Sequence, residues 1–450
     1  MAQKLFRDPL YDYIAIDIDK HPWLLKLINC PEVQRLRYIS QLGLSQFTYP
    51  GSTHSRFSHS LGVLHMMQQC LEYLNRDYGD YFNNGDEDAL LAAALLHDIG
   101  HGPFSHATED FFGNHEEKSV QIIARSESAV NKVLTEVDGE LPAKVAALIA
   151  KEPQEGLPQP LLWQKALISS PLDVDRLDYL RRDSLASGAE YGNFDWFRIL
   201  RTMTLKEKTI KGEEKAIWLV WPDKTKYALE EYLFARFYMY QSVYFHHTTR
   251  GFEKLLLKIL ERAKDVAANN NKTFRENILW PLRSFLIPDG KPQPDDFLYL
   301  TDNIMTAQIT LWQRDKDKIL SDLTHRLLFR NKLAWKEIQG TEMEMPDPDT
   351  ILKVRNYLQE QGKDHNYYFL KDKTQAPVYK PYRTVSETED QSSANSIILY
   401  DPSWERTGFL EISDVPGLQR LKVITVEKPP PIMRYYFPKE HKGQIKKLLT

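Results

Sequence analysis

The chain has 450 residues, of which 42% are apolar and 27% charged, and this composition is typical of a globular protein and excludes a disordered one. At roughly 150 residues per domain, the length allows about three domains, or one large core with an appendage. Lys and Arg total 58 against 62 Asp and Glu, which gives a formal charge of −4. This balance provides no overall attraction to nucleic acid or acidic lipid and leaves only a local basic groove open.

The lack of recognisable targeting signals and the small number of cysteines favour the cytoplasm. The longest apolar stretch, Ala89–Leu96, is far shorter than the ~20 residues needed to cross a bilayer. The N-terminus lacks the apolar segment of a signal peptide. Cys30 and Cys70 are the only cysteines, so the sequence predicts neither a disulfide framework nor a cysteine-based metal site. We therefore expect a cytoplasmic protein without a membrane partner.

The patterns in chain order predict a mainly α fold. Apolar residues recur at helical spacing from Asp19 to about Arg201, which indicates a large helical body. A polar turn at residues 211–214, followed by Ile217–Trp221, predicts a β-hairpin near residues 205–223 inserted into that body. Helical periodicity then resumes over residues 227–268 and 295–335. We expect residues 1–340 to form one helical domain.

Residues 350–450 have a different pattern, because short β-rich runs are separated by Pro, Gly and Asp and followed by a basic helix, Pro438–Leu449. The predicted strands are Ala376–Tyr382, Ser396–Tyr400, Phe409–Ile412 and Leu421–Val426. This tail predicts a smaller α+β domain appended to the helical one.

His59 is the first polar residue in an apolar position. It lies on the same face of a predicted helix as Val63 and Met66. A buried histidine needs a partner on each ring nitrogen, and a metal ion supplies one. Taken alone, a hydrogen-bonded histidine of the core is the more frequent explanation.

A second polar cluster follows the apolar helix that ends at Leu96. His97 and Asp98 stand at the buried end of this helix, where an imidazole and a carboxylate are costly unless they are paired or bind a metal. Four of the 13 histidines fall in the window from His97 to His115. Such a cluster favours a chemical role over chance.

A third segment supplies a second carboxylate. Asp175, Tyr179 and Asp183 recur at i, i+4 and i+8, which places them on one helical stripe, although a solvated charged face is equally common on its own. Two imidazoles and two carboxylates suit Fe, Mn, Ni, Zn or Co rather than Ca. A metal held by so few protein ligands keeps positions open for water and a phosphate oxygen. The sequence therefore predicts a metal site within residues 50–185.

Four motifs in chain order resemble the HD-domain metal-dependent phosphohydrolases, in particular the deoxynucleoside-triphosphate triphosphohydrolase branch. The motifs are Arg35–Gly43 (RLRYISQLG), His54–Gly62 (HSRFSHSLG), His97–His106 (HDIGHGPFSH) and Asp173–Asp183 (DVDRLDYLRRD). The resemblance covers roughly residues 1–260. It implies hydrolysis of a dNTP at the α-phosphorus, which releases deoxynucleoside and tripolyphosphate.

The resemblance also implies a role for individual residues. The metal ligands would be His59, His97, Asp98 and Asp175. Protons would be moved by His101 and His115, with Glu109 at a position where the family has Asp. The substrate would be bound by Gln41, Leu42, Arg56, His106, Arg176, Tyr179, Asp183, Arg236 and Tyr244. In the family an aromatic ring and the Gln-Leu pair pack against C2′ and exclude a ribose hydroxyl, while arginines bind the phosphates.

Family members form tetramers that nucleotides order at subunit interfaces. The resemblance therefore implies a homotetramer, a nucleotide activator, and Mg²⁺ on the substrate phosphates beside the resident metal. The activator site would draw on Lys4, Asn29, Gln34, Arg37 and Arg198, although ordinary surface charge explains these residues equally well. Asn29 stands where the guanine-specifying enzyme is acidic and lacks the charge that favours guanine, so we expect no strict dGTP activation.

Other functions stay open at this stage. An HD-type phosphodiesterase or exonuclease acting on nucleic acid or a cyclic nucleotide would use the same metal, but a nuclease should show a long basic groove with stacking aromatics. A 5′-nucleotidase would leave Gln41, Leu42 and Tyr179 without a purpose. A non-catalytic nucleotide sensor would be expected to have a broken ligand or proton-transfer set, and this chain has both sets complete.

Overall fold

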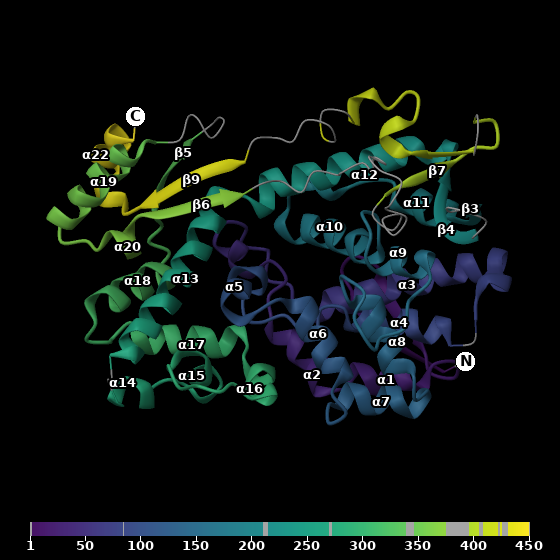
Figure 1. Cartoon of the computed structure of the whole chain (residues 1–450), viewed down its shortest axis with the longest axis horizontal. Helices are drawn as coiled ribbons and strands as arrows, with labels where there is room; N and C mark the ends of the chain where they lie inside the picture. Colours follow the sequence, from purple (N-terminus) through teal and green to yellow (C-terminus); the bar gives the residue numbers. More distant parts are fainter. Residues whose placement is uncertain are drawn as a thin grey trace.

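The computed structural model describes residues 2–83, 85–209, 215–269, 272–338, 346–374, 396–404, 408–421, 424 and 431–449. It is mainly α-helical, with a few small sheets and a smaller α+β part at the C-terminus, as the sequence predicts (Figure 1). Within these ranges, no helix is both long and apolar enough to cross a membrane.

The N-terminal half forms a helical body around one apolar core. Its helices are α1 (Pro22–Ile28), α2 (Pro31–Gln34), α3 (Arg56–Tyr78), α4 (Asp86–Leu96), α5 (Glu109–Phe112), α6 (His115–Ala124), α7 (Ala129–Val137), α8 (Leu141–Ile149), α9 (Leu162–Ile168), α10 (Val174–Ser187) and α11 (Trp196–Thr202). Helix α4 is the centre of this body, because all its side chains from Ala89 to Leu96 are buried. Helix α3 packs on both α4 and α10, which brings the metal-ligand candidates of three separate motifs together.

An N-terminal hairpin covers one side of the body. Strands β1 (Gln3–Asp8) and β2 (Asp12–Asp17) pair antiparallel, with Asp8 opposite Asp12 at the turn. Ile14 and Ile16 of β2 are fully buried in the core, while Leu5 of β1 is exposed. The sequence pattern indicates helices only from Asp19 onward and did not predict this hairpin.

The inserted hairpin predicted near residues 205–223 is confirmed. Strands β3 (Thr204–Thr209) and β4 (Lys215–Pro222) pair antiparallel. The chain returns to this hairpin much later, because β7 (Ile398–Tyr400) pairs parallel with β4 and antiparallel with β8 (Phe409–Glu411). Two of the predicted strands of the tail thus lie on the helical body (Figure 1).

A second apolar core forms around a long helix. Helix α12 (Lys226–Met239) continues through a π-helical turn, Tyr240–Tyr244, and is followed by α13 (His247–Ala268). The helices that follow are α14 (Lys272–Glu276), α15 (Trp280–Leu286), α16 (Pro294–Tyr299), α17 (Asp302–Trp312) and α18 (Lys318–Leu328). They pack with α13 in a cluster that also receives Phe104 and Phe112, so the two cores meet beside the candidate site.

The C-terminal sheet lies at the far end of the molecule from the inserted hairpin (Figure 1). Strand β9 (Ile432–Phe437) is central, between β5 (Ala334–Ile338) and β6 (Leu370–Thr374). Helices α19 (Pro348–Glu360), α20 (His365–Tyr368) and α22 (Lys442–Leu448) accompany it. Because β5 precedes residue 340, the sheet draws on both predicted domains, and their division stays a prediction. The predicted strand Ala376–Tyr382 and most of Leu421–Val426 lie outside the described residues.

Candidate metal centre and substrate pocket

Three helices supply the candidate metal ligands. His59 lies on α3, His97 directly follows α4, and Asp175 stands in the first turn of α10. Asp173 caps α10 by accepting a hydrogen bond from the backbone of Arg176 at 2.8 Å, which fixes where this helix begins. His59 is fully buried, so its ring orientation is set by packing.

The imidazoles of His59 and His97 converge on one carboxylate oxygen. Their Nε2 atoms lie 3.0 and 3.6 Å from Oδ1 of Asp175. The carboxylate of Asp98 lies 3.4 Å from Nε2 of His97 and 3.7 Å from Nε2 of His59. We refer to His59, His97, Asp98 and Asp175 as the metal group.

The metal group fits a bound cation. Nδ1 of His59 is hydrogen-bonded to Asp178 at 2.7 Å, and Nδ1 of His97 to the carbonyl of Ala94 at 2.9 Å. The Nε2 atoms of both rings are buried and, among the described residues, have no hydrogen-bond partner. Buried polar atoms are rarely left unsatisfied, and metal-binding imidazoles use one nitrogen for the metal and the other for an orienting acceptor.

The local electrostatics also favour positive charge at this point. Burial by itself lowers the pKa of His59, but the carboxylates of Asp175 and Asp178 outweigh it and raise that pKa to about 10. Burial alone would raise the pKa of Asp175, but His59 and His97 hold it well below its ordinary value. The ligand chemistry, two imidazoles and carboxylate oxygens, suits a divalent transition metal.

Arg56 fixes the position of Asp98. This arginine is 3% exposed; its Nη1 donates to Asp98, and its Nε donates to Oγ of Ser105 at 2.7 Å. The sequence assigned Arg56 to a substrate phosphate, and the structure places it on a carboxylate of the metal group. The contact between Arg56 and Ser105 depends on a turn in which Phe104 and Ser105 both adopt left-handed backbone conformations, with φ of 57° and 56°. Such conformations are unfavourable for these residues and are retained where the surroundings enforce them.

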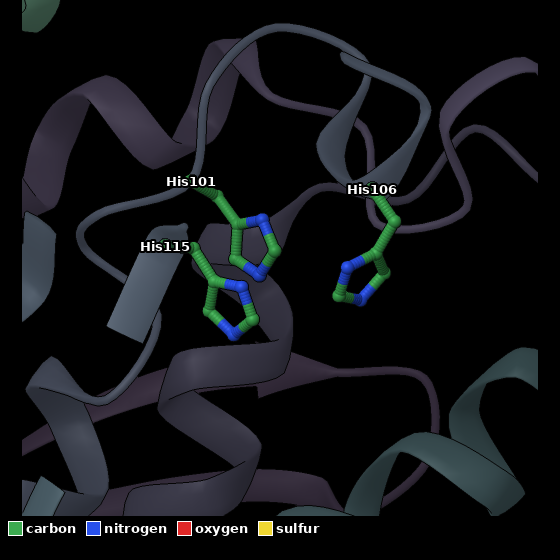
Figure 2. Close-up of side chains that lie close together, drawn as sticks. All are labelled: His101, His106 and His115. Carbon is green, nitrogen blue, oxygen red and sulfur yellow. The ribbon is translucent and has the colours of Figure 1, made fainter. Parts of the chain in front are cut away.

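A second set of side chains lies next to the metal group. The rings of His101 and His115 stack with centroids 3.8 Å apart, and His106 approaches them edge-on at 4.8 and 5.3 Å (Figure 2). Glu109 accepts hydrogen bonds from Nδ1 of His106 at 2.8 Å and from Nδ1 of His115 at 2.5 Å. We refer to these four residues as the histidine group. All four were predicted from the sequence, and the structure brings them together.

The histidine group is suited to moving protons. Although burial raises the pKa of Glu109, its hydrogen bonds to His106 and His115 hold that pKa well below the ordinary range. Burial, Arg56 and His115 lower the pKa of His101, which favours the neutral imidazole. One ligand atom from each of the three imidazoles lies within 4.8 Å of the others. The rings of His101 and His115, however, stack face to face, and this arrangement does not point their nitrogen atoms at one shared metal position.

Two arginines and several tyrosines form the next wall of the site. Arg176 lies on α10 and Arg236 on α12, two helices that pack together. The Nε atoms of both arginines are buried and lack a hydrogen-bond partner in the described part of the chain. Tyr179 contacts Tyr244 edge-on, with ring centroids 6.2 Å apart. These four residues were all predicted to bind substrate.

The remaining predicted substrate residues gather around Asp183. Its carboxylate accepts a hydrogen bond from the hydroxyl of Tyr244 at 2.8 Å and pairs with Nε2 of His54 at 2.8 Å. The backbone of Gln41 donates to the carbonyl of His54 at 3.0 Å, which brings the Gln41–Leu42 pair to the same place. Within the described residues, Oε1 of Gln41 and Nδ1 of His54 are buried without hydrogen-bond partners.

The five residues proposed for an activator do not form one group in a single chain. Gln34 donates to the carbonyl of Ile28 and accepts from Arg37, so both lie at the end of α1 beside Asn29. Lys4 is on β1, and Arg198 on α11 donates to the carbonyl of Lys224. In the parts of the chain that the structure describes, no hydrogen bond or ion pair joins these three places.

Three contact residues were not assigned a role from the sequence. They are His54 on Asp183, Asp178 on His59, and Tyr11, whose hydroxyl donates to Asp178 at 2.9 Å. His54 and Asp178 lie inside the recognised motifs, so their position offered a signal. Tyr11 comes from the unpredicted N-terminal hairpin and offered none.

Comparison with known families agrees with this geometry. The family model described as HD domain matches residues 56–183, which include the metal group and the histidine group. A second model, HD associated region, matches residues 194–277, which include Arg236 and Tyr244.

The chain is similar to proteins from several organisms. It is 35% identical over 387 residues to the uncharacterised protein YwfO of Bacillus subtilis, a match that covers 86% of this chain and 83% of that protein. It is 31% identical over 232 residues to the human deoxynucleoside triphosphate triphosphohydrolase SAMHD1, covering 44% of this chain and 36% of SAMHD1. The crystal structure of a phosphohydrolase from Bacteroides thetaiotaomicron matches with a TM-score of 0.75 and 27% identity, over 97% of this chain and all of that one.

Proposed function

The chain belongs to the HD-domain phosphohydrolase family, and from this premise we propose that it is a metal-dependent dNTP triphosphohydrolase that cleaves at the α-phosphorus. The observation that carries the proposal is a set of buried polar atoms on the predicted ligands. Nε2 of His59 and His97, Nε of Arg176 and Arg236, and Oε1 of Gln41 all lack a hydrogen-bond partner within the described residues. A metal ion, a polyphosphate and a sugar would satisfy them in that order.

The metal would be held by His59, His97, Asp98 and Asp175. A divalent metal bound there supplies Lewis-acid chemistry and lowers the pKa of a water molecule, which makes a nucleophile available at neutral pH. Arg56 orients Asp98 through its guanidinium, so it contributes to binding the metal and not to the phosphates alone.

The histidine group would move protons at the scissile bond. Nε2 of His101 lies 3.4 Å from Asp98, and its ring stacks on His115, so the group would lie beside a metal bound there. Glu109 orients His115 through Nδ1, and Nε2 of this ring would then be the nitrogen that donates a proton to the leaving deoxynucleoside.

Arg176 and Arg236 would bind the polyphosphate. Both are permanently charged, and although Nη1 of Arg176 pairs with Asp173, the buried Nε atoms of both arginines have no hydrogen-bond partner among the described residues, so phosphate oxygens could accept from them. Gln41, Leu42, Tyr179, Asp183 and Tyr244 would surround the sugar, where a filled space at C2′ excludes a ribose hydroxyl. The similarity to SAMHD1, named for this activity, supports the same substrate class.

Product analysis tests the proposal. We would load the chain with Mn²⁺ or Fe²⁺, incubate it with each dNTP alone and in mixtures, and resolve the products by chromatography. The proposal predicts deoxynucleoside and tripolyphosphate in equal amounts, and slower turnover of the matching ribonucleotides. Pyrophosphate or orthophosphate as the first product would contradict it, as would cleavage of oligonucleotides without release of tripolyphosphate.

The regulation of this activity is a separate part of the proposal. Gln34 and Arg37 beside Asn29, together with Lys4 and Arg198, would bind an activating nucleotide where subunits of a homotetramer meet. Since no hydrogen bond or ion pair joins these three places within the described residues, we propose that residues from more than one subunit complete the nucleotide site. Turnover that appears only in dNTP mixtures, together with a nucleotide-dependent increase in mass by light scattering, is the expected result.

A further inference from the structure

The turn of the N-terminal hairpin contacts the residue that orients a metal ligand. Asp178 is fully buried, and its Oδ2 is hydrogen-bonded to Nδ1 of His59 at 2.7 Å. Its Oδ1 accepts a hydrogen bond from the hydroxyl of Tyr11, which lies in the turn between β1 and β2, at 2.9 Å. A single carboxylate therefore connects the hairpin with the metal group.

Arg182 holds the same carboxylate from another side. Its Nε donates to Oδ2 of Asp178 at 2.8 Å, and its Nη2 donates to Oδ1 at 3.0 Å. Its Nη1 donates to Asp8, at the end of β1, at 2.8 Å. Asp8 in turn accepts from the backbone of Tyr11 at 3.1 Å, so the arginine fixes the hairpin turn and the carboxylate together.

The packing around Asp178 leaves it little freedom. A Cβ atom on Gly62, three residues after His59 on α3, would lie 2.0 Å from Oδ1 of Asp178 and 2.4 Å from Nη2 of Arg182. The absence of a side chain at Gly62 makes room for the ion pair. The ring of Tyr11 packs on His65, with centroids 4.7 Å apart, which sets the direction of its hydroxyl.

We propose that Asp178 is a positioning residue for the metal ligand His59, and that Tyr11 and Arg182 set the metal affinity by holding that carboxylate. A carboxylate on Nδ1 fixes the tautomer of a metal-binding imidazole, directs Nε2 at the metal and raises its basicity. The hairpin, which also contributes Ile14 and Ile16 to the core, then has a second role at the metal centre. This inference rests on the metal centre of the proposed function.

The test measures Mn²⁺ binding to the full-length, metal-free chain by isothermal titration, without any substrate. Asp178→Asn should raise the dissociation constant about 10–100-fold, the range typical for residues that orient metal ligands. Tyr11→Phe keeps the packing on His65 and removes only the hydroxyl, and it should weaken binding several-fold. Tyr13→Phe removes a hydroxyl from an exposed ring of the same hairpin and should bind as the wild type does.

Thermal unfolding of the metal-free variants separates positioning from folding. Tyr11→Phe should stay folded and unfold close to the wild-type temperature, because it loses one hydrogen bond, while its Mn²⁺ affinity falls. This pair of results supports the proposal even if Asp178→Asn does not fold. Wild-type affinity in Tyr11→Phe, or an equal loss in Tyr13→Phe, would overturn it. A wild-type chain that binds no Mn²⁺ would contradict the metal centre itself, and a chain that binds Mn²⁺ without cleaving dNTPs would contradict only the proposed function.

Discussion

The metal group and the histidine group lie side by side but hold their imidazoles in opposite ways. In the metal group, Nδ1 of His59 and His97 is hydrogen-bonded, while Nε2 of each ring makes no hydrogen bond in the described part of the chain and faces the carboxylate of Asp175. In the histidine group, the carboxylate of Glu109 joins two rings through Nδ1, and His101 and His115 stack. The first arrangement gathers empty ligand atoms at one point, and the second gathers exchangeable protons. The surrounding carboxylates, and not the histidines alone, make the difference.

Loss of a metal ligand should have the largest effect on both metal binding and turnover. Asp175→Ala removes the carboxylate on which both Nε2 atoms converge, so Mn²⁺ binding should become undetectable and dNTP turnover should fall at least about 1000-fold. Titration calorimetry and the chromatographic assay measure the two effects. Asp110→Asn, an exposed carboxylate on α5, is the matched control. Turnover at the wild-type rate in Asp175→Ala would contradict the metal-centred mechanism.

A change in the histidine group should lower turnover without lowering the affinity for the metal. Glu109→Gln removes the charge that orients His106 and His115, so turnover should fall about 100-fold or more, the usual contribution of general acid–base catalysis. The Mn²⁺ affinity should stay within about threefold of the wild type, because the Glu109 carboxylate bonds the histidine group and not the metal group.

Glu117→Gln, an exposed glutamate two residues after His115, is the control for this variant and should leave turnover unchanged. If Glu109→Gln lost metal affinity and turnover in parallel, the two groups would have to be treated as one centre.

A histidine outside both groups sharpens the comparison. His21 pairs with Glu87 and Asp88, each at 3.3 Å, and these carboxylates raise its pKa from 6.5 to about 9 despite the opposing effect of burial. A raised pKa in the folded state means that the stabilisation is complete below pH 6.5 and is lost as the pH rises through about 9. His21→Gln should therefore lower the free energy of unfolding by about 1 kcal/mol at pH 6 and by much less at pH 10.

Urea unfolding at the two pH values measures this difference. Mn²⁺ affinity and turnover of His21→Gln should match the wild type, since His21 lies between the N-terminal hairpin and α1, away from both groups. An equal loss of stability at both pH values would show that packing, and not charge, is what His21 contributes.

Much of the candidate site was predicted from local patterns. The apolar helix ending at Leu96, the stripe from Asp175 to Asp183 and the four ordered motifs together predicted the metal ligands. The inserted hairpin was predicted because a turn flanked by alternating and β-branched residues is a short-range signal. Residues such as Tyr11, His54 and Asp178 could not be assigned in this way, because their roles depend on partners more than 100 positions away.

The sequence by itself determined the fold class, the residue types available to a metal, and the family, since helical periodicity and motif spacing are properties of neighbouring residues. The tertiary structure decided which of those residues meet. It set Arg56 against Asp98, a contact that the sequence did not predict, and it returned β7 of the tail to the hairpin of the body through its pairing with β4. The physical reason is that a buried charge must find its counter-charge, and a strand edge its partner, wherever packing brings one close, and neither choice is written in local spacing.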